Sequence, residues 1–371
     1  MKRALIAAAI CFVLLVFLAG VVLFEKLRPM FQAMSAAQEV PQTLKLARVV
    51  AGANDFSKST FFSAPELGVI TDLQSGSDNG LVIVGKNGAV FLAEDHTLRK
   101  SITYDSCTSD VSLASIGKGA FLCRAAQMGG PSLIDLDGKT LWSYDRDSIG
   151  IGADDSAAGE LGMAHTQGIA VGMNGNGGVR LLTPEGKEVW RKPEGNVWHI
   201  EIAATDDNSQ SLILHSDAAG QLTVRAPNGD IVSRTSPELY LAWFTLTPWG
   251  TNPNRNKLIT AGEGGLYILS MDGKTVARLP TPENKISTVQ AKGMTVHFVP
   301  GSTSYASIIR NPIWNRTLLY IYDAENRITY DEILDHDCGS INAAKNANGS
   351  EDLLVGCDGT VIRYSPAART P

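Results

Sequence analysis

Two stretches decide the fold: SLIDLDGKTLWSY at residues 132–144 and VRLLTPEGKEVW at residues 179–190. Each contains a run rich in branched and aromatic residues, a turn with an Asp-Gly or Glu-Gly pair, and a second such run. Asp-Gly turns favour β-hairpins, because glycine adopts positive φ at no steric cost. Both stretches are therefore predicted to be β-hairpins.

The same pattern recurs along the chain from about residue 67. The four clearest turns have glycines spaced 48, 43 and 44 residues apart: Gly138, Gly186, Gly229 and Gly273. Weaker copies turn near Asp95 and Asn326, and a further unit, LLVGCDGTVIRYS, begins at Leu353. A period of about 45 residues made of short strands is typical of the four-stranded blades of a β-propeller. The count of units predicts seven blades.

The last unit ends before its outermost strand. A propeller ring leaves no open sheet edge only if its first and last blades are joined. We therefore expect a strand from residues 43–62, with LKLARVV at 44–50 as a candidate, to complete the last blade. The prediction is an all-β, seven-bladed β-propeller over residues 43–371, closed by an N-terminal strand.

Single repeats resemble those of two propeller families. The two quoted hairpins are similar to the repeat of quinoprotein (PQQ)-like propellers, in which a tryptophan after the turn packs between blades; Trp142 and Trp190 match it. Residues 68–92 and 341–364 resemble the integrin-α-like (FG-GAP) repeat. Other units lack the tryptophan, so the first resemblance covers part of the ring.

The resemblance implies a propeller of the bacterial cell envelope that works without a cofactor. Quinoprotein enzymes usually carry two adjacent cysteines, and this sequence has none. Related lipoproteins without a cofactor help to assemble outer-membrane proteins. We expect no cofactor, another envelope protein as the partner, and room for a small-molecule ligand as an alternative.

Charge and motifs exclude several classes of function. The 371 residues carry a net charge of −6, and the basic residues are scattered. Nucleic-acid binding requires a concentrated basic face, so it is not expected. The sequence also lacks a phosphate-binding glycine loop opening a helix, a serine nucleophile elbow and an HExxH motif.

The first residues predict a membrane anchor. Residues 4–24 contain no charge, and a helix of about 20 residues crosses a bilayer. No small-residue cleavage site follows closely, which favours an uncleaved signal anchor over a cleaved signal peptide. Lys2 and Arg3 place residues 1–3 in the cytoplasm, and residues 25–42 would form a linker. We therefore expect a single-pass protein of the bacterial inner membrane with its propeller in the periplasm.

Four cysteines follow the predicted anchor, in two pairs: Cys107 with Cys123, and Cys338 with Cys357. The spacing places one member of each pair at the start of an innermost strand and the other on the next strand. Neighbouring antiparallel strands bring such residues within disulfide range. Two disulfides within blades suit an oxidising compartment. Four buried thiols in a reducing compartment are the alternative, whereas a metal site is not expected from this spacing.

The histidines suggest catalysis as an alternative function. His199, His297 and His336 are predicted near innermost strands, which line the central channel where propeller active sites commonly lie; His199 and His336 are the candidates for catalysis. A channel histidine acting as nucleophile or base would resemble the periplasmic arylsulfate sulfotransferases. We favour a structural role for both histidines, and a propeller without catalysis.

Two tryptophans in Pro- and Asn-rich loops suggest a binding surface. Trp249 and Trp314 lie in these loops, with Arg255 and Arg310 nearby. Exposed aromatic side chains beside arginine are typical of binding surfaces. The alternative is that they cap blade ends.

Acidic residues raise the question of calcium. Four stretches are expected to be acidic loops, and their aspartates are Asp72, Asp78, Asp154, Asp155, Asp206, Asp207 and Asp352. None has the dense alternation of ligands that a calcium loop needs. We expect solvated hairpin loops and no metal, with a calcium-stabilised adhesion-type propeller as an alternative.

Overall fold

The computed structural model describes Gly20 and residues 56–75, 80–104, 111–116, 120–124, 129–144, 152–162, 166–205, 211–249, 256–262, 265–281, 290–311, 316–334 and 336–366. Apart from Gly20, the predicted anchor at 4–24, the linker at 25–42 and the strand candidate at 44–50 lie outside these residues. They stay predictions. Within the described ranges, no helix combines the length and apolar character needed to cross a bilayer.

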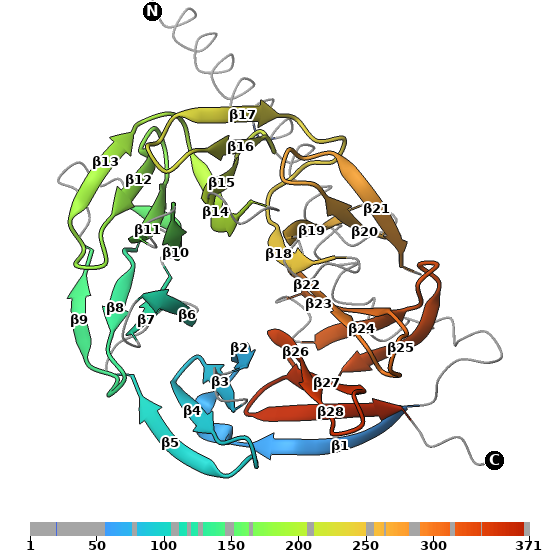
Figure 1. Cartoon of the computed structure of the whole chain (residues 1–371). Helices are drawn as coiled ribbons and strands as arrows, with labels where there is room; N and C mark the ends of the chain where they lie inside the picture. The colour runs from blue at the N-terminus through green and yellow to red at the C-terminus, as the bar shows by residue number, and fades with distance from the viewer. Residues whose placement is uncertain are drawn as a thin grey trace, which may run out of the picture. The chain divides into compact units, whose positions relative to one another are not determined.

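Seven four-stranded antiparallel sheets are arranged as blades around a ring (Figure 1), which confirms the predicted seven-bladed propeller. Blades 1 to 3 comprise β2 (Ile70–Ser75), β3 (Leu81–Gly85), β4 (Gly88–Leu92) and β5 (Leu98–Thr103); β6 (Val111–Ile116), β7 (Ala120–Cys123), β8 (Ser132–Ile134) and β9 (Thr140–Ser143); and β10 (Ala153–Leu161), β11 (Thr166–Met173), β12 (Gly178–Leu182) and β13 (Glu188–Lys192). Blades 4 to 6 comprise β14 (Val197–Ala204), β15 (Ser211–Asp217), β16 (Leu222–Arg225) and β17 (Ile231–Thr235); β18 (Thr245–Pro248), β19 (Asn256–Gly262), β20 (Gly265–Leu269) and β21 (Thr275–Pro280); and β22 (Gln290–Val296), β23 (Ser304–Asn311), β24 (Arg316–Tyr322) and β25 (Ile328–Leu334).

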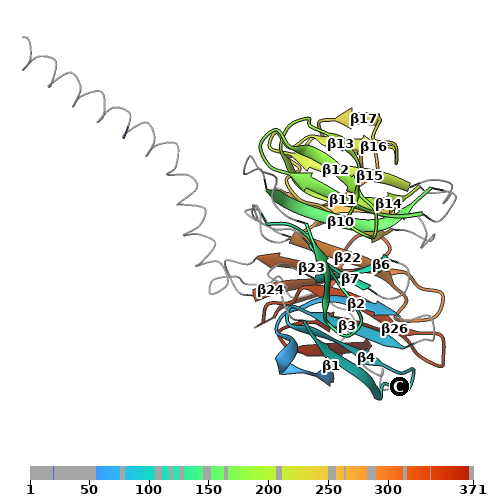
Figure 2. The same ribbon diagram turned by 90° about the vertical axis from the view of Figure 1, so that its left-hand side faces the viewer.

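Blade 7 combines strands from both ends of the described sequence. It contains β26 (Ser340–Lys345), β27 (Glu351–Gly356), β28 (Thr360–Pro366) and, as its outermost strand, β1 (Phe56–Ser63). β1 pairs antiparallel with β28, from Phe56 opposite Pro366 to Ser63 opposite Thr360. A short 3-10 helix, η1 (Pro65–Leu67), then leads into blade 1. In Figures 1 and 2, blades 3 and 4 lie across the ring from blade 7.

The hairpin between the third and fourth strands is the repeated local structure. Four of these turns place a glycine at positive φ: Gly138, Gly186, Gly229 and Gly273. Blades 1 and 6 place His96 and Asn326 there, both with φ of 63°. The register shifts beside these turns, as in a three-residue hairpin loop with a glycine bulge. Because asparagine tolerates this conformation, the weaker repeat near Asn326 still forms the hairpin.

Trp142 and Trp190 pack between blades, as the resemblance implied. Trp142 Nε1 donates to the Pro184 carbonyl at 2.8 Å, and Trp190 Nε1 donates to the Pro227 carbonyl at 2.9 Å. A Cβ on Gly186 would lie 2.9 Å from the Trp142 ring. Glycine therefore has two roles at this turn. It adopts the positive φ, and its lack of a Cβ leaves room for the tryptophan of the preceding blade.

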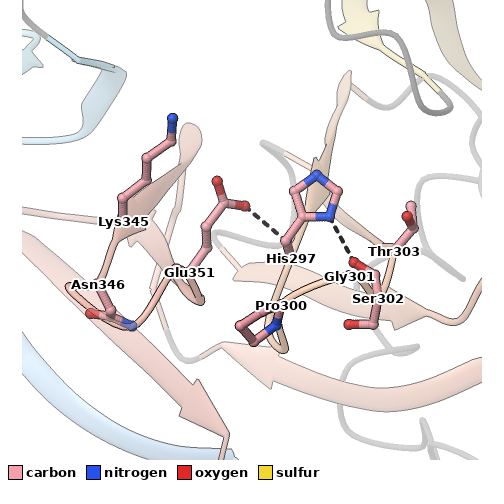
Figure 3. A pocket seen from close by; sticks show the side chains of 9 residues that line it. His297, Pro300, Gly301, Ser302, Thr303, Lys345, Asn346 and Glu351 are labelled. Carbon is pink, nitrogen blue, oxygen red and sulfur yellow. Dashed lines mark hydrogen bonds between the residues drawn. The ribbon is translucent and has the colours of Figure 1, made fainter.

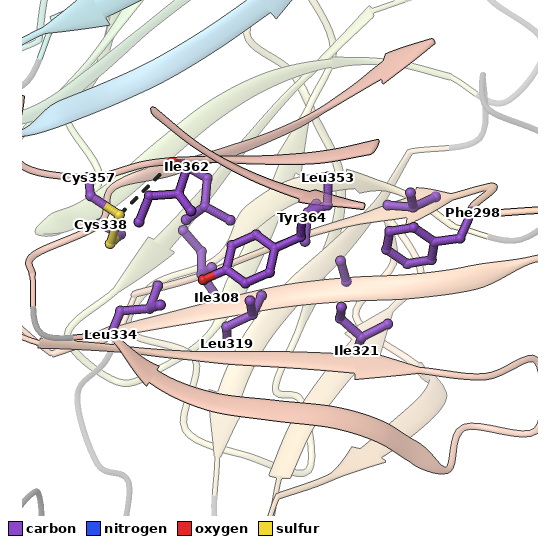
Figure 4. Close-up of a cluster of buried hydrophobic side chains, with 13 residues drawn as sticks. Phe298, Ile308, Leu319, Ile321, Leu334, Cys338, Leu353, Cys357, Ile362 and Tyr364 are labelled. Carbon is purple, nitrogen blue, oxygen red and sulfur yellow. Dashed lines mark hydrogen bonds between the residues drawn. A yellow bond between two sulfur atoms is a disulfide. The ribbon is translucent and has the colours of Figure 1, made fainter. Parts of the chain in front are cut away.

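The core lies between neighbouring blades. Figure 4 shows the cluster that joins blades 6 and 7, in which Leu319, Leu353 and Tyr364 are fully buried. Phe56, from β1, packs edge-on against Phe298 and Tyr330 in the same region. β1, the first described strand in the chain, thus contributes to the core between the last two blades.

Candidate functional site

An ionic network connects blades 2, 3 and 4 at the inner strands. Arg124 directly follows β7, Asp155 lies on β10, and His199 and Glu201 lie on β14. The register of β14 shifts between Val197 and His199. This irregularity leaves Trp198 partly exposed and turns His199 into the interior. The bulge is therefore the local reason that His199 meets Asp155.

The network is dense in hydrogen bonds. His199 Nδ1 lies 2.6 Å from Asp155 Oδ2. Arg124 donates from Nε and Nη2 to the two carboxylate oxygens of Asp155, each at 3.1 Å. Its Nη1 donates to Glu201 Oε1 at 3.1 Å, and Nη2 also donates to the Ile200 carbonyl. Each blade of the three therefore holds the next through charged groups.

The electrostatics keep Arg124 and Asp155 ionised. Burial alone would raise the pKa of Asp155, but Arg124 and His199 hold it below the usual value. Burial alone would lower the pKa of Arg124, but Asp155 and Glu201 raise it instead. The guanidinium and the Asp155 carboxylate are thus a buried charge pair, whose partners compensate for the loss of water.

His199 is sealed from solvent. Its side chain has no exposed surface, and the ring lies 3.8 Å from the Trp243 ring and 4.6 Å from the Phe244 ring, centroid to centroid. Nε2 lies 3.5 Å from Glu201 Oε1. A substrate has no access to this histidine in the observed arrangement. The geometry supports a structural role for His199.

His336, the other alternative catalytic histidine, lies elsewhere. It is exposed in the connection that leads into β26, whereas His199 lies on β14 in blade 4. Its backbone carbonyl is 3.6 Å from Cys338 Sγ. The described residues give no contact between the two histidines, so they do not form one constellation.

Two acidic residues expected in solvated loops are instead buried on strands. Asp155 is 2% exposed on β10 and Asp352 is 6% exposed on β27. The loop prediction was wrong for both residues. It rested on composition, because acidic residues are common in loops, whereas burial depends on the contacts that a side chain makes in the folded protein. Asp72 on β2 and Asp154 on β10 also lie on strands rather than in loops, whereas Asp78, Asp206 and Asp207 lie outside the described residues. Within those residues, no three His, Cys, Asp or Glu side chains converge to hold a metal ion.

The predicted aromatic surface is divided by the topology. Trp249 directly follows β18, and its ring lies 4.6 Å from that of Tyr305, at the start of β23. Arg310 lies five residues further along β23, toward the opposite end of the blade. It donates to both carboxylate oxygens of Asp337, at 2.6 and 2.8 Å. Trp249 and Arg310 are therefore not brought together.

The remaining members of that surface, Arg255 and Trp314, lie outside the described residues. Arg310 also resembles Arg124 in its structural role, an ion pair with the next blade. Each follows or ends the second strand of a blade and pairs with an aspartate at the start of the next blade. Arg310 is thus engaged within the ring.

One of the predicted disulfides is present among the described residues: Cys338 is bonded to Cys357. It joins the segment that leads into β26 to the residue that directly follows β27, within blade 7. Cys123 is also disulfide-bonded. Cys107, its predicted partner, lies outside the described residues, so that pairing stays a prediction.

An open depression of about 520 Å³ lies where two turns meet (Figure 3). One turn connects β22 to β23 in blade 6, and the other connects β26 to β27 in blade 7. Its charged and titratable side chains are His297, Lys345 and Glu351. The two turns hold each other, because the backbone N–H of His297 donates to Glu351 Oε2 and the backbone N–H of Glu351 donates to the His297 carbonyl, both at 2.8 Å.

The sequence had pointed to His297 only as a histidine near an inner strand, and Lys345 and Glu351 not at all. These residues are 48 and 54 positions from His297, roughly one blade away. Equivalent turns of successive blades lie at one end of the inner strands, so the repeat period itself carried the signal. The structure makes this depression the candidate binding site.

No protein-family model and no curated protein sequence matches this chain. Solved structures show the same fold. Virginiamycin B lyase from Staphylococcus aureus is 12% identical, with a TM-score of 0.57, covering 84% of this chain and 99% of that one. BBS1N in complex with ARL6DN is also 12% identical, with a TM-score of 0.55 and coverage of 86% and 98%. The Neurospora crassa Pan2 WD40 domain reaches a TM-score of 0.50 at 12% identity, with coverage of 87% and 98%. The chain is thus similar in fold to propellers that include an enzyme and a protein in a complex.

Proposed function

We propose that this protein is a membrane-anchored β-propeller of the cell envelope that binds another protein and performs no catalysis of its own. The observation that carries the proposal is the contrast between two polar sites. His199, the candidate with a carboxylate partner, is fully buried among Arg124, Asp155 and Glu201. The His297 site, in contrast, is open to solvent and formed by turns.

The proposed location is the periplasmic face of a bacterial inner membrane. The uncharged segment at residues 4–24 and the basic residues before it support this orientation. The Cys338–Cys357 disulfide supports it as well, because such bonds persist mainly in oxidising compartments. Disulfides and anchoring are independent features of the chain that favour the same side of the membrane.

The solved structures of similar fold include both a protein bound to another protein and an enzyme. One was solved in complex with another protein, and another is a lyase. At 12% identity they carry no residue roles to this chain. A periplasmic enzyme that uses an exposed histidine such as His336 is the second reading, and it is separable by experiment.

The test uses the full-length chain in bacterial membranes. Protease added to spheroplasts should degrade the propeller, while an epitope placed before residue 4 stays protected until the membrane is lysed. Turnover of aryl sulfates and ester substrates should be absent, and a His336→Ala variant should not differ from the parent. A propeller protected from external protease would contradict the location, and turnover lost in the variant would contradict the absence of catalysis.

A further inference from the structure

The depression between the turns of blades 6 and 7 is lined by the polar side chains of His297, Ser302 and Glu351 and by the ammonium group of Lys345. Figure 3 shows the His297 ring and the Glu351 carboxylate side by side, with Ser302 beyond them and Lys345 on the far side of Glu351. Ser302 Oγ donates its proton to the Val299 carbonyl at 2.8 Å, which leaves its lone pairs as acceptors. The chemistry of the site depends on the state of His297 and Glu351.

Neighbouring atoms fix the tautomer of His297. Nδ1 lies 2.7 Å from the Ser302 carbonyl oxygen, which can only accept. Nδ1 must therefore carry the proton, and Nε2 of the neutral ring is an acceptor. In Figure 3 this nitrogen points away from Ser302. A histidine held in this way presents one lone pair to a ligand.

Glu351 carries a negative charge that no described cation neutralises. Its Oε2 accepts from the His297 backbone, and no ion pair joins it to Lys345 or to another described residue. The carboxylate is nevertheless partly buried, so its loss of water is incompletely compensated. A donor-rich cation in the depression would satisfy Oε1 of Glu351 and Nε2 of His297 together.

We propose that this depression binds a guanidinium or ammonium group, namely an arginine or lysine side chain of the protein partner. The proposal rests on the proposed binding function and names where the partner is held. Arginine fits best, because its planar fork offers five N–H donors to converging acceptors. The net charge of −6 on this chain favours a basic partner segment as well.

The experiment is a titration of the full-length chain with a short blocked arginine peptide. The readout is the imidazole proton resonance of His297, one of six histidines in the chain and assigned by its loss in His297→Asn. A peptide with citrulline in place of arginine keeps the shape without the charge and is the matched control. We expect the resonance to shift and saturate with the arginine peptide and to stay unchanged with the citrulline peptide.

Three substitutions refine the test by calorimetry. Glu351→Gln keeps an acceptor for the His297 backbone but removes the charge, and should weaken binding roughly five- to tenfold. His297→Asn keeps a donor for the Ser302 carbonyl but removes Nε2, and should also weaken binding. Lys345→Met removes a repelling cation and should strengthen it.

Several results would overturn the proposal. Equal binding of both peptides, or weaker binding in Lys345→Met, would indicate a site without preference for cations. A His297 shift with zinc chloride but not with the arginine peptide would indicate a metal site instead. If a partner is recovered from membranes and Glu351→Gln binds it unchanged, this inference fails while the proposed function stands.

Discussion

At the scale of single residues, buried charges determine which polar groups are free to act. Asp155 lies between Arg124 and His199, and both of these side chains bond to its two carboxylate oxygens. The sequence identified His199 as a candidate but did not identify its partners. Arg124 and Asp155 come from other blades, 75 and 44 positions away, and no local pattern marks them. Residue propensities and spacing predict the strands. They do not predict which side chains of three different blades come into contact, because that depends on the three-dimensional structure.

Asp155→Asn should strongly destabilise the propeller. The substitution keeps the volume but leaves the Arg124 guanidinium and His199 buried beside a neutral amide. Breaking a buried pair from one side typically costs about 3 to 5 kcal/mol in the free energy of unfolding. Urea unfolding of the two proteins measures the difference. Asp137→Asn, which affects an exposed pair with Lys100, is the control and should change little; equal effects would contradict the role given to Asp155.

His215 should make stability depend on pH. Burial, together with the charges of Arg225 and Arg234, lowers the pKa of His215 to about 3. Between about pH 6.5 and pH 3 the unfolded chain binds a proton that the folded chain refuses, so stability falls as pH falls. His215→Gln should flatten this dependence by up to about 1.4 kcal/mol per pH unit. Chemical denaturation at pH 7, 6 and 5 provides the measurement, and parallel curves for both proteins would count against it.

At the scale of elements, the hairpin turns were the most predictable part of the molecule. Glycine at the positive-φ position marked four of them in sequence, and Asn326 marked another more weakly. Strand limits in the inner part of each blade were less predictable, because innermost strands such as β22 and β26 mix buried and half-buried residues without a sustained alternation. The candidate binding site was missed because its turns contain no motif, and only the blade period relates His297 to Lys345 and Glu351.

The disulfide of blade 7 should contribute to stability. Cys338 and Cys357 close a loop of 19 residues, for which the chain-entropy model gives about 3 kcal/mol. Cys338→Ala combined with Cys357→Ala should lower the free energy of unfolding by about that amount. Adding reductant to this double variant then isolates the contribution of the disulfide at Cys123. No loss in the double variant would show that packing in Figure 4 suffices without the bond.

β1 should be needed for a stable ring. It covers the edge of β28 and places Phe56 against Phe298. A chain that starts at Ala64 should expose this edge, lower the melting temperature and aggregate, whereas a chain that starts at residue 51 retains β1 and should behave as the parent. Thermal melting and size-exclusion chromatography compare them. A monomeric, equally stable short chain would show that the ring closes without β1.

At the scale of the whole molecule, the fold was predictable and the function was not. The repeat period predicted seven blades, and Trp142 and Trp190 predicted how two of the blades pack against the next, because these signals lie within single units. Binding depends on which turns of different units face solvent together. His297 and Glu351 acquire a joint chemistry only in the closed ring, and similarity in fold to propellers of differing function does not supply it.

Cross-linking mass spectrometry of the full-length chain in its native membranes tests the central claim most directly. The account predicts a defined envelope protein cross-linked to the propeller, with an arginine or lysine segment near the turns of blades 6 and 7. The same adduct should form in His199→Gln, because His199 is structural. A chain that captures no protein, together with a turnover that disappears when His336 is replaced, would contradict the account and identify an enzyme.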